Sequence, residues 1–149
     1  MNITLREARP NDDDLLYRLH RAAMQTYVIQ TWGLWDEDWQ SRYFHQHFNP
    51  STCQIIVVQG KDTGVISVFR RTTEIFLGNI ELLPAFQGQG IGTHLITALI
   101  AEAQQKSISI TLQVLKVNPA LKLYERLGFM VEGETATHYL MSRAPTRLA

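Results

Sequence analysis

Three glycines at alternate positions, Gly88, Gly90 and Gly92, are the clearest candidates for ligand binding in this sequence. Glycine has no Cβ, so the backbone N–H groups here can approach a ligand closely and several can turn the same way. The amphipathic run that begins at Ile91 predicts a helix whose first N–H groups lack partners and carry the positive end of the helix dipole. Together these features predict a site for a phosphate or diphosphate group.

The segments on either side of the glycines must hold this loop in place. The apolar strand expected at 74–83 stops at Pro84, which lacks the N–H needed to continue a ladder. The helix after the loop is indicated by apolar residues at spacings of three and four, which are Ile91, Leu95, Ile96, Leu99, Ile100 and Ala103. A strand expected at 108–114 follows, and this order requires a parallel strand–helix–strand crossover.

The rest of the pattern predicts an α/β (α+β) protein with a mixed, mostly antiparallel central sheet of about six to seven strands flanked by about four helices. The other expected elements are a strand at 3–8, a helix ending near Met24, a helix starting near Asp36, strands at 53–59 and 65–71 joined by a hairpin loop at 60–64, a helix at 119–127, and strands at 130–133 and 136–142. We expect a single domain over residues 1–143 and a flexible tail at 144–149.

Composition narrows the functional classes. The 149 residues are 45% apolar and 19% charged, which suits one domain with a core. Fourteen basic and fourteen acidic residues give no basic field for nucleic acid or a membrane surface. The single cysteine, Cys53, excludes an internal disulfide or thiolate cluster, and acids at 12–14 suit a helix start better than a metal. Without a signal peptide or a membrane-length apolar run, we expect a cytoplasmic protein that binds no metal.

The segment 27–39 holds all three tryptophans of the chain together with several acids and amides. Aromatic walls with nearby carboxylates suit a cationic amine, through attraction to the ring faces and charge pairing. We therefore take Trp32, Trp35, Asp36 and Glu37 as candidate substrate-binding residues, with ordinary packing as the open alternative. The aromatic residues that follow are expected to pack in the core, and they are Tyr43, Phe44 and Phe48.

Two motifs resemble the GNAT superfamily of acyl-CoA-dependent N-acyltransferases. The superfamily's Q/R-x-x-G-x-G/A signature is met at 87–92, and its N-x-x-A-x-x-L-Y-x-x-x-G-F segment is nearly met at 118–129. Both motifs fall in the right order on elements predicted independently. The resemblance implies transfer of an acetyl group from acetyl-CoA to a primary amine.

The resemblance also implies roles for particular positions. In relatives, backbone groups matching the strand at 80–82 hold the acetyl group and pantetheine arm, and the glycine loop wraps the pyrophosphate of coenzyme A. The tyrosine matching Tyr124 commonly protonates the departing thiolate. The implied cofactor-binding residues are Ile80, Leu82, Gln87, Gly88, Gln89, Gly90, Ile91, Gly92, Thr93 and Asn118.

The sequence does not decide which residue is the general base. Relatives that acetylate the N-termini of ribosomal proteins often have a glutamate where this chain has Gln113, and glutamine cannot act as a base. Glu81 is the best substitute because it interrupts an apolar strand, where a carboxylate without a function would cost stability. The alternatives are Glu74, Glu37, His138 or a water relay.

Two functions follow from these observations. The first is an N-acetyltransferase whose acceptor, a small-molecule or peptide amine, attacks the thioester directly. The alternative is a catalytically weak acyl-CoA-binding sensor that keeps the glycine loop. Neither hypothesis involves nucleic acid or a membrane, and a homodimer through the exposed final strands is left open.

Overall fold

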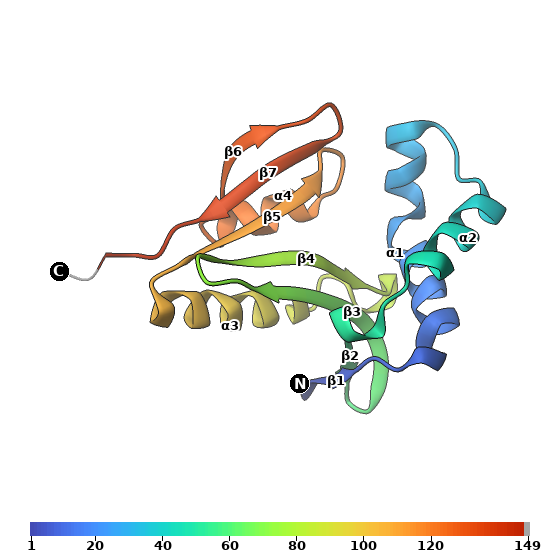
Figure 1. Cartoon of the computed structure of the whole chain (residues 1–149), viewed down its shortest axis with the longest axis horizontal. Coiled ribbons are helices and arrows are strands. Elements are labelled where there is room, and N and C mark those ends of the chain that lie inside the picture. Colours follow the sequence, from blue (N-terminus) through green and yellow to red (C-terminus); the bar gives the residue numbers. More distant parts are fainter. Residues whose placement is uncertain (148–149) are drawn as a thin grey trace. The chain divides into compact units, whose positions relative to one another are not determined.

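The protein is described by a computed structural model that covers residues 1–147 (Figure 1). The strands are β1 (Ile3–Glu7), β2 (Gln54–Val58), β3 (Lys61–Arg70), β4 (Glu74–Leu82), β5 (Ser109–Leu115), β6 (Met130–Glu134) and β7 (His138–Arg143). The helices are α1 (Asp13–Trp32), α2 (Glu37–His47), α3 (Ile91–Lys106) and α4 (Ala120–Arg126), with short 3-10 turns η1 (Pro10–Asp12), η2 (Pro50–Thr52) and η3 (Pro84–Phe86). No helix within this range is long and apolar enough to cross a membrane.

The described strands form one seven-stranded sheet in the order β1-β2-β3-β4-β5-β7-β6. β4 and β5 are parallel and are joined through α3, which confirms the predicted crossover. The pairs β1–β2, β2–β3, β5–β7 and β6–β7 are antiparallel. The predicted α/β class, with its mixed and mostly antiparallel sheet, is therefore confirmed.

The chain divides into two compact units. The first contains Met1–Ser67 and Asn79–Gln89, and the second contains Val68–Gly78 and the described residues from Gly90 to 147. The single domain expected over residues 1–143 stays a prediction. Of the tail expected at 144–149, the last two residues lie outside the described range, and Thr146 exchanges two hydrogen bonds of 2.8 Å with the side chain of Gln104.

In the first unit, α1 extends well beyond the predicted end near Met24. It continues to Trp32 and stops at Gly33, which has φ +90° and donates its N–H to the carbonyl of Ile29 at 2.8 Å. The helix contains no proline or glycine before that position. Gly33 is thus the first residue that adopts the left-handed C-terminal cap without strain, and the sequence-based boundary was wrong.

The core of the first unit lies between α1 and the strands β2 and β3. Its buried members are Leu16, Leu19, Ile55 and Val65. Phe44 and Phe48, from α2 and the residue after it, pack against this cluster, and α1 and α2 lie side by side (Figure 1). Tyr17 and Ala23 of α1 are also buried, whereas Ala22 is exposed.

The β2–β3 hairpin is tighter than the predicted loop at 60–64. Its turn is Gln59–Gly60, with φ values of +51° and +80°, and β3 already begins at Lys61. Two consecutive residues with positive φ are typical of a two-residue hairpin turn, because this backbone matches the twist of the strands. The sequence-based prediction of a five-residue loop was therefore too long. The longer strand places more of β3 beside its neighbours.

A bulge in β3 brings the hairpin close to the end of β4. Ile56 pairs with Gly64 while the next residue of β2 pairs with Asp62, so Thr63 is the extra residue. The buried Thr63 accepts a hydrogen bond from the N–H of Leu83 on its carbonyl at 2.9 Å. A Cβ on Gly64 would lie only 2.5 Å from the carbonyl oxygen of Glu81, so only glycine fits here without displacement.

In the second unit, the predicted apolar face of α3 is buried, with Ile91, Leu95, Ile96, Leu99 and Ala103 all in the core. The short helix α4 follows β5 and is followed by Gly128, which has φ +93°. Its start and stop therefore match the sequence prediction. The hairpin β6–β7 completes the unit (Figure 1).

Candidate active site

Glu81 lies on β4 in the first unit, and its side chain is only 4% exposed. His20 Nδ1 lies 2.8 Å from one carboxylate oxygen and 3.1 Å from the other, and the amide of Asn79 donates to Oε1 at 3.2 Å. Because a carboxylate only accepts, Nδ1 must carry a proton in this pair. A buried carboxylate is costly unless it is paired, and here α1 supplies the partner.

His20 reaches Glu81 from the buried side of α1, one helical turn after Leu16. Its ring stacks against Phe44 of α2 at a centroid distance of 5.8 Å and an angle of 24°. Trp35 covers another side of the ring at 6.0 Å. These two rings hold the imidazole, which remains 29% exposed, in the orientation that the Glu81 pair requires.

The pKa of His20 is raised above its ordinary value. Burial opposes this by disfavouring the charged ring, but the hydrogen bond to Glu81 and the negative charge of that carboxylate together outweigh it. The imidazolium is therefore favoured to a higher pH than in an isolated histidine.

A pocket of about 280 Å³ opens beside this pair within the first unit. Its lining combines the His20–Glu81 pair with aromatic and small polar groups, namely Leu16, Gln40, Tyr43, Phe44, His47, Phe48, Asn49, Thr52, Cys53, Val65, Ser67 and Asn79. Tyr43, Phe44 and Phe48 were expected to be core residues. Phe44 and Phe48 do pack against the core cluster and also line the pocket, whereas Tyr43 lines the pocket and is half exposed.

The predicted amine-binding segment is only partly assembled around this pocket. Trp35 donates from Nε1 to Glu37 at 2.8 Å, and Glu37 also accepts from Tyr17 at 3.0 Å and Arg21 at 3.1 Å. The hydrogen bond from Trp35 is the largest of the effects that lower the pKa of Glu37. The charge of Glu37 is thus balanced by Arg21, and its hydrogen bond to Trp35 holds that ring against His20.

The other two residues of that segment have local contacts. Asp36 caps α2 by accepting the N–H of Trp39 on its side chain at 3.1 Å. Trp32 is the last residue of α1 and is largely exposed. Only Trp35 and Glu37 therefore connect to the His20–Glu81 pair, through the ring of Trp35.

Two of the three glycines in the loop adopt left-handed backbone conformations. Gly88 and Gly90 have φ values of +74° and +83°, and nothing lies within 4 Å of the Cβ that either could carry. Gln87 and Gln89 donate from their side chains to the carbonyls of Leu82 at 3.0 Å and Ala85 at 2.9 Å, which fixes the loop. The open backbone and the unpaired first amides of α3 fit a diphosphate group.

The remaining residues of the predicted cofactor site differ in what they can offer a ligand. Ile91 is buried, so only its backbone is suited to contact a ligand, whereas Thr93 is exposed in the first turn of α3. A Cβ on Gly92 would make an ordinary contact of 3.5 Å with Leu123, so close packing does not require glycine there. Ile80 and Leu82 are partly buried on β4.

Asn118 and Tyr124 lie in the second unit at the start and within α4. The side-chain oxygen of Asn118 accepts the N–H of Ala120 at 2.9 Å, so a ligand contact would have to come from its amide nitrogen. Tyr124 is buried, packs edge-on against Phe129 at 5.8 Å, and has its pKa raised to about 12 by burial. Its hydroxyl therefore keeps its proton throughout the physiological range.

The alternative bases differ in their surroundings. Glu74 accepts hydrogen bonds from Arg71 at 2.9 Å and Thr111 at 3.0 Å, and His138 contacts the hydroxyl of Thr137 at 2.7 Å. Gln113 is exposed on β5. Of these candidates, only Glu37 shares a hydrogen-bonded and stacked cluster with Glu81.

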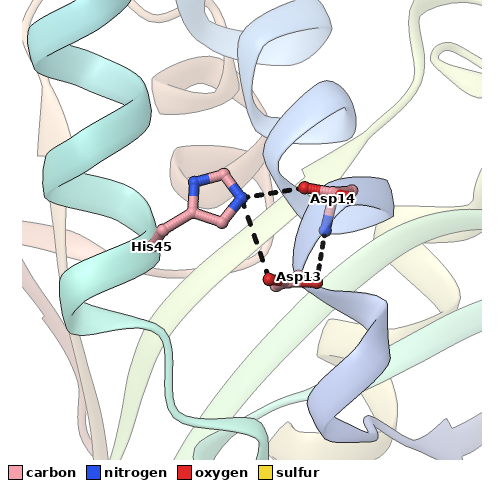
Figure 2. A group of neighbouring side chains, drawn as sticks. All are labelled: Asp13, Asp14 and His45. Atoms are coloured by element: carbon pink, nitrogen blue, oxygen red, sulfur yellow. Dashed lines mark hydrogen bonds and ion pairs between the residues drawn. The ribbon is translucent and has the colours of Figure 1, made fainter.

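The acids at the start of α1 face a histidine, as Figure 2 shows. His45 from α2 approaches Asp14 through Nε2 at 3.0 Å and lies 3.9 Å from Asp13, while its Nδ1 contacts the carbonyl of Ser41 at 2.7 Å. The Ser41 carbonyl, followed by Asp14, raises the pKa of His45. Since both ring nitrogens face oxygen acceptors, the group is best explained as an ion pair that joins the helices at a favourable dipole end.

His20 is the functional candidate that sequence reasoning missed. It follows Leu16 by four positions and so falls on the buried face of the first helix. A histidine on that face was the available signal. Its partner, 61 residues away on a strand, could not be identified from spacing alone.

Sequence comparison identifies the family to which the chain belongs. The sequence model of the Acetyltransferase (GNAT) family matches residues 15–129. The chain belongs to this family. A [ribosomal protein bS18]-alanine N-acetyltransferase from Haemophilus influenzae is 40% identical over 57 residues, which cover 38% of this chain and 39% of that protein.

Solved structures of other GNAT proteins share the fold over nearly the whole chain. The PaiA N-acetyltransferase from Thermoplasma acidophilum, crystallised with coenzyme A, has a TM-score of 0.76 at 17% identity and covers 97% of this chain and 99% of its own. The ribosomal-protein-S18-alanine N-acetyltransferase from Escherichia coli has a TM-score of 0.68 at 20% identity, covering 99% and 97%. At 17% and 20% identity, this structural similarity shows a shared fold alone.

Proposed function

We propose that this GNAT protein transfers the acetyl group of acetyl-CoA to a primary amine by direct attack of the amine on the thioester. The observation that carries the proposal is the Glu81 carboxylate, buried and paired with His20 on the wall of a pocket of about 280 Å³. Such a pair suits removal of the proton that an amine loses when it is acylated.

The glycine loop would hold the pyrophosphate of coenzyme A. Its backbone at Gly88 and Gly90 is open to a ligand, and the first amides of α3 follow directly. Asn118 would add its amide nitrogen, and backbone groups of Ile80 and Leu82 would hold the acyl end of the cofactor. Acetyl-CoA supplies the activated acetyl group as a thioester, and we assign no metal to the reaction.

Tyr124 would act as a hydrogen-bond donor to the departing sulfur. With its pKa near 12 and an ordinary thiol pKa of about 8.5, complete proton transfer would be uphill by roughly 5 kcal/mol. A donated hydrogen bond stabilises the developing thiolate without that cost. The coenzyme would then take its final proton from water.

The acceptor is a small-molecule or peptide amine. The relative from Haemophilus influenzae is named for its action on an alanine of ribosomal protein bS18. A peptide that begins with alanine therefore belongs in the set of candidate acceptors, together with 2-phenylethylamine, spermidine and free lysine. The aromatic wall formed by Tyr43, Phe44 and Phe48 favours acceptors with an apolar group next to the amine.

The direct test follows the release of free thiol from acetyl-CoA with each acceptor of this set. Acetyl transfer to at least one amine, confirmed by mass spectrometry of the product, supports the enzyme. Coenzyme A binding measured by calorimetry, with no turnover on any acceptor, would instead support the acyl-CoA sensor.

The phosphate loop has its own matched pair of variants. Gly90→Ala and Gly33→Ala place a Cβ in open space at φ values of +83° and +90°, so both carry the same kind of backbone strain. We expect only Gly90→Ala to weaken coenzyme A binding, by 10-fold or more, with similar losses of stability in both. Unchanged affinity in Gly90→Ala would show that the loop is not the phosphate site.

A further inference from the structure

The His20–Glu81 pair has a defined direction. Nδ1 of His20 points at the carboxylate, with distances of 2.8 and 3.1 Å to its two oxygens. A neutral ring held this way carries its proton on Nδ1 and its lone pair on Nε2. The carboxylate thus selects the tautomer whose other nitrogen is basic.

We propose that His20, through Nε2, is the general base that takes the proton of the acceptor amine, and that Glu81 is the positioning residue that orients the ring. The inference rests on the proposed function, because it names the proton acceptor of that reaction. It assigns to α1 a catalytic group that the family motifs in the second half of the chain do not contain.

Exposure separates the two members of the pair. The Glu81 side chain is 4% exposed, and both of its oxygens already accept hydrogen bonds from His20, with Asn79 adding a second to Oε1. The His20 ring is 29% exposed and lines the pocket. A molecule in the pocket therefore meets the ring edge more readily than the carboxylate behind it.

The contacts around the ring support a positioned base. Phe44 and Trp35 cover two sides of the imidazole at 5.8 and 6.0 Å, and Glu37 fixes Trp35 through a hydrogen bond of 2.8 Å. This support extends to Tyr17 and Arg21, which also bind Glu37. The packing leaves the ring fewer orientations, which favours a base with a fixed direction.

In the proposed step the amine proton moves to His20, and the thiolate leaves with the electron pair of the C–S bond. The amine nitrogen attacks the thioester carbon, the new C–N bond forms, and one N–H proton passes to Nε2 of His20. The C–S bond breaks with its electron pair on sulfur, which leaves as the coenzyme A thiolate and is protonated from solvent. His20 then returns its proton to water, and Glu81 keeps its charge throughout.

The charges near the ring favour this cycle. Among the described residues that line the pocket, Glu81 is the only acid, and the other titratable groups are Tyr43, His47 and Cys53. Behind Trp35 lie Glu37 and Arg21, which pair with each other at 3.1 Å. Glu81 therefore dominates the charge felt by His20, and it favours the imidazolium formed when the amine loses its proton.

The test compares three variants with the wild type, using the acceptor that gives the highest rate. His20→Asn keeps an amide N–H near the Nδ1 position but has no basic nitrogen, and His20→Ala opens a space for imidazole added to the buffer. Glu81→Gln removes the orienting charge. His45→Gln, on α2 and outside the pocket, is the control for the loss of a histidine and of a helix–helix ion pair.

We expect His20→Asn to lower kcat by about 10²- to 10³-fold at every pH, while coenzyme A affinity stays within 2-fold. Added imidazole should restore at least 10-fold of the activity of His20→Ala, and Glu81→Gln should move the acidic limb of the wild-type kcat/KM profile to lower pH. His45→Gln should keep the wild-type profile although it melts at a lower temperature.

The experiment distinguishes failure of the proposed function from failure of the assignment of His20. A wild type that acetylates no amine of the set overturns the proposed function and the inference with it. An active wild type whose His20→Asn variant is equally active, or whose His20→Ala variant is not rescued by imidazole, overturns the inference alone. Nitrogen-detected NMR of His20 supplies a readout without turnover: we expect the Nδ1–H tautomer at high pH, and the Nε2–H tautomer would refute the assignment.

Discussion

Gly64→Ala tests how closely β3 approaches the backbone that carries Glu81. A Cβ at this position would lie 2.5 Å from the Glu81 carbonyl oxygen, 2.7 Å from Leu82 Cδ2 and 3.1 Å from Ile56 Cδ1. Ordinary contact begins at 3.4 Å, so the first of these must lengthen by about 0.9 Å. Because the obstacle is backbone, a side-chain rotation cannot relieve it, and the strands must separate.

Overpacking of this kind costs about 1–3 kcal/mol, a large share of the 5–15 kcal/mol that stabilises an ordinary domain. For a chain of this length we expect the melting temperature of Gly64→Ala to fall by roughly 2–12 °C. Calorimetry gives the shift, and urea unfolding with an unchanged m-value would show a loss of stability without a change in the surface exposed on unfolding. The kcat/KM for acetyl transfer should fall as well, because the displaced backbone carries Glu81.

Gly133→Ala on β6 is the matched control. Its Cβ would lie 3.5 Å from the end of the Leu140 side chain, an ordinary contact, and Gly133 has no positive φ. The same substitution in a strand should therefore leave stability within about 0.5 kcal/mol or raise it slightly. If Gly64→Ala melts at the same temperature as Gly133→Ala, the argument from close strand approach is refuted.

Two further predictions concern particular hydrogen bonds. The raised pKa of His20 means that its pairing stabilises the fold fully below the ordinary value of 6.5 and less as pH rises through the raised value. The difference in unfolding free energy between wild type and His20→Asn, measured in urea, should thus be largest below pH 6.5 and shrink as the pH rises through the raised pKa of the paired ring; a difference independent of pH would contradict the pairing. Asn118→Ala removes the acceptor of the Ala120 N–H and should lower the free energy of unfolding by about 1 kcal/mol, whereas Asn118→Asp keeps an acceptor and should lower it by only about a few tenths of a kcal/mol. Equal losses of stability in urea unfolding would show that the side-chain oxygen of Asn118 does not stabilise the start of α4.

The sequence by itself determined the elements whose signals are local. The face of α3 follows from the period of its apolar residues, and the loop before it from three glycines at alternate positions between a strand and a helix. The parallel β4–β5 pair follows from strand, helix and strand in that order. Each of these depends on neighbours within a few residues, so chain order and residue type suffice.

Only the tertiary structure decided which side chains meet. His20 and Glu81 are 61 residues apart, and their pairing depends on the face that α1 turns toward β4. The extension of α1 to Trp32 and the two-residue turn at Gln59–Gly60 likewise depend on packing and backbone twist that residue type leaves undetermined. A buried carboxylate in an apolar strand indicated that a partner must exist, because an unpaired one is costly, but only the packing of α1 against the sheet identified that partner as His20.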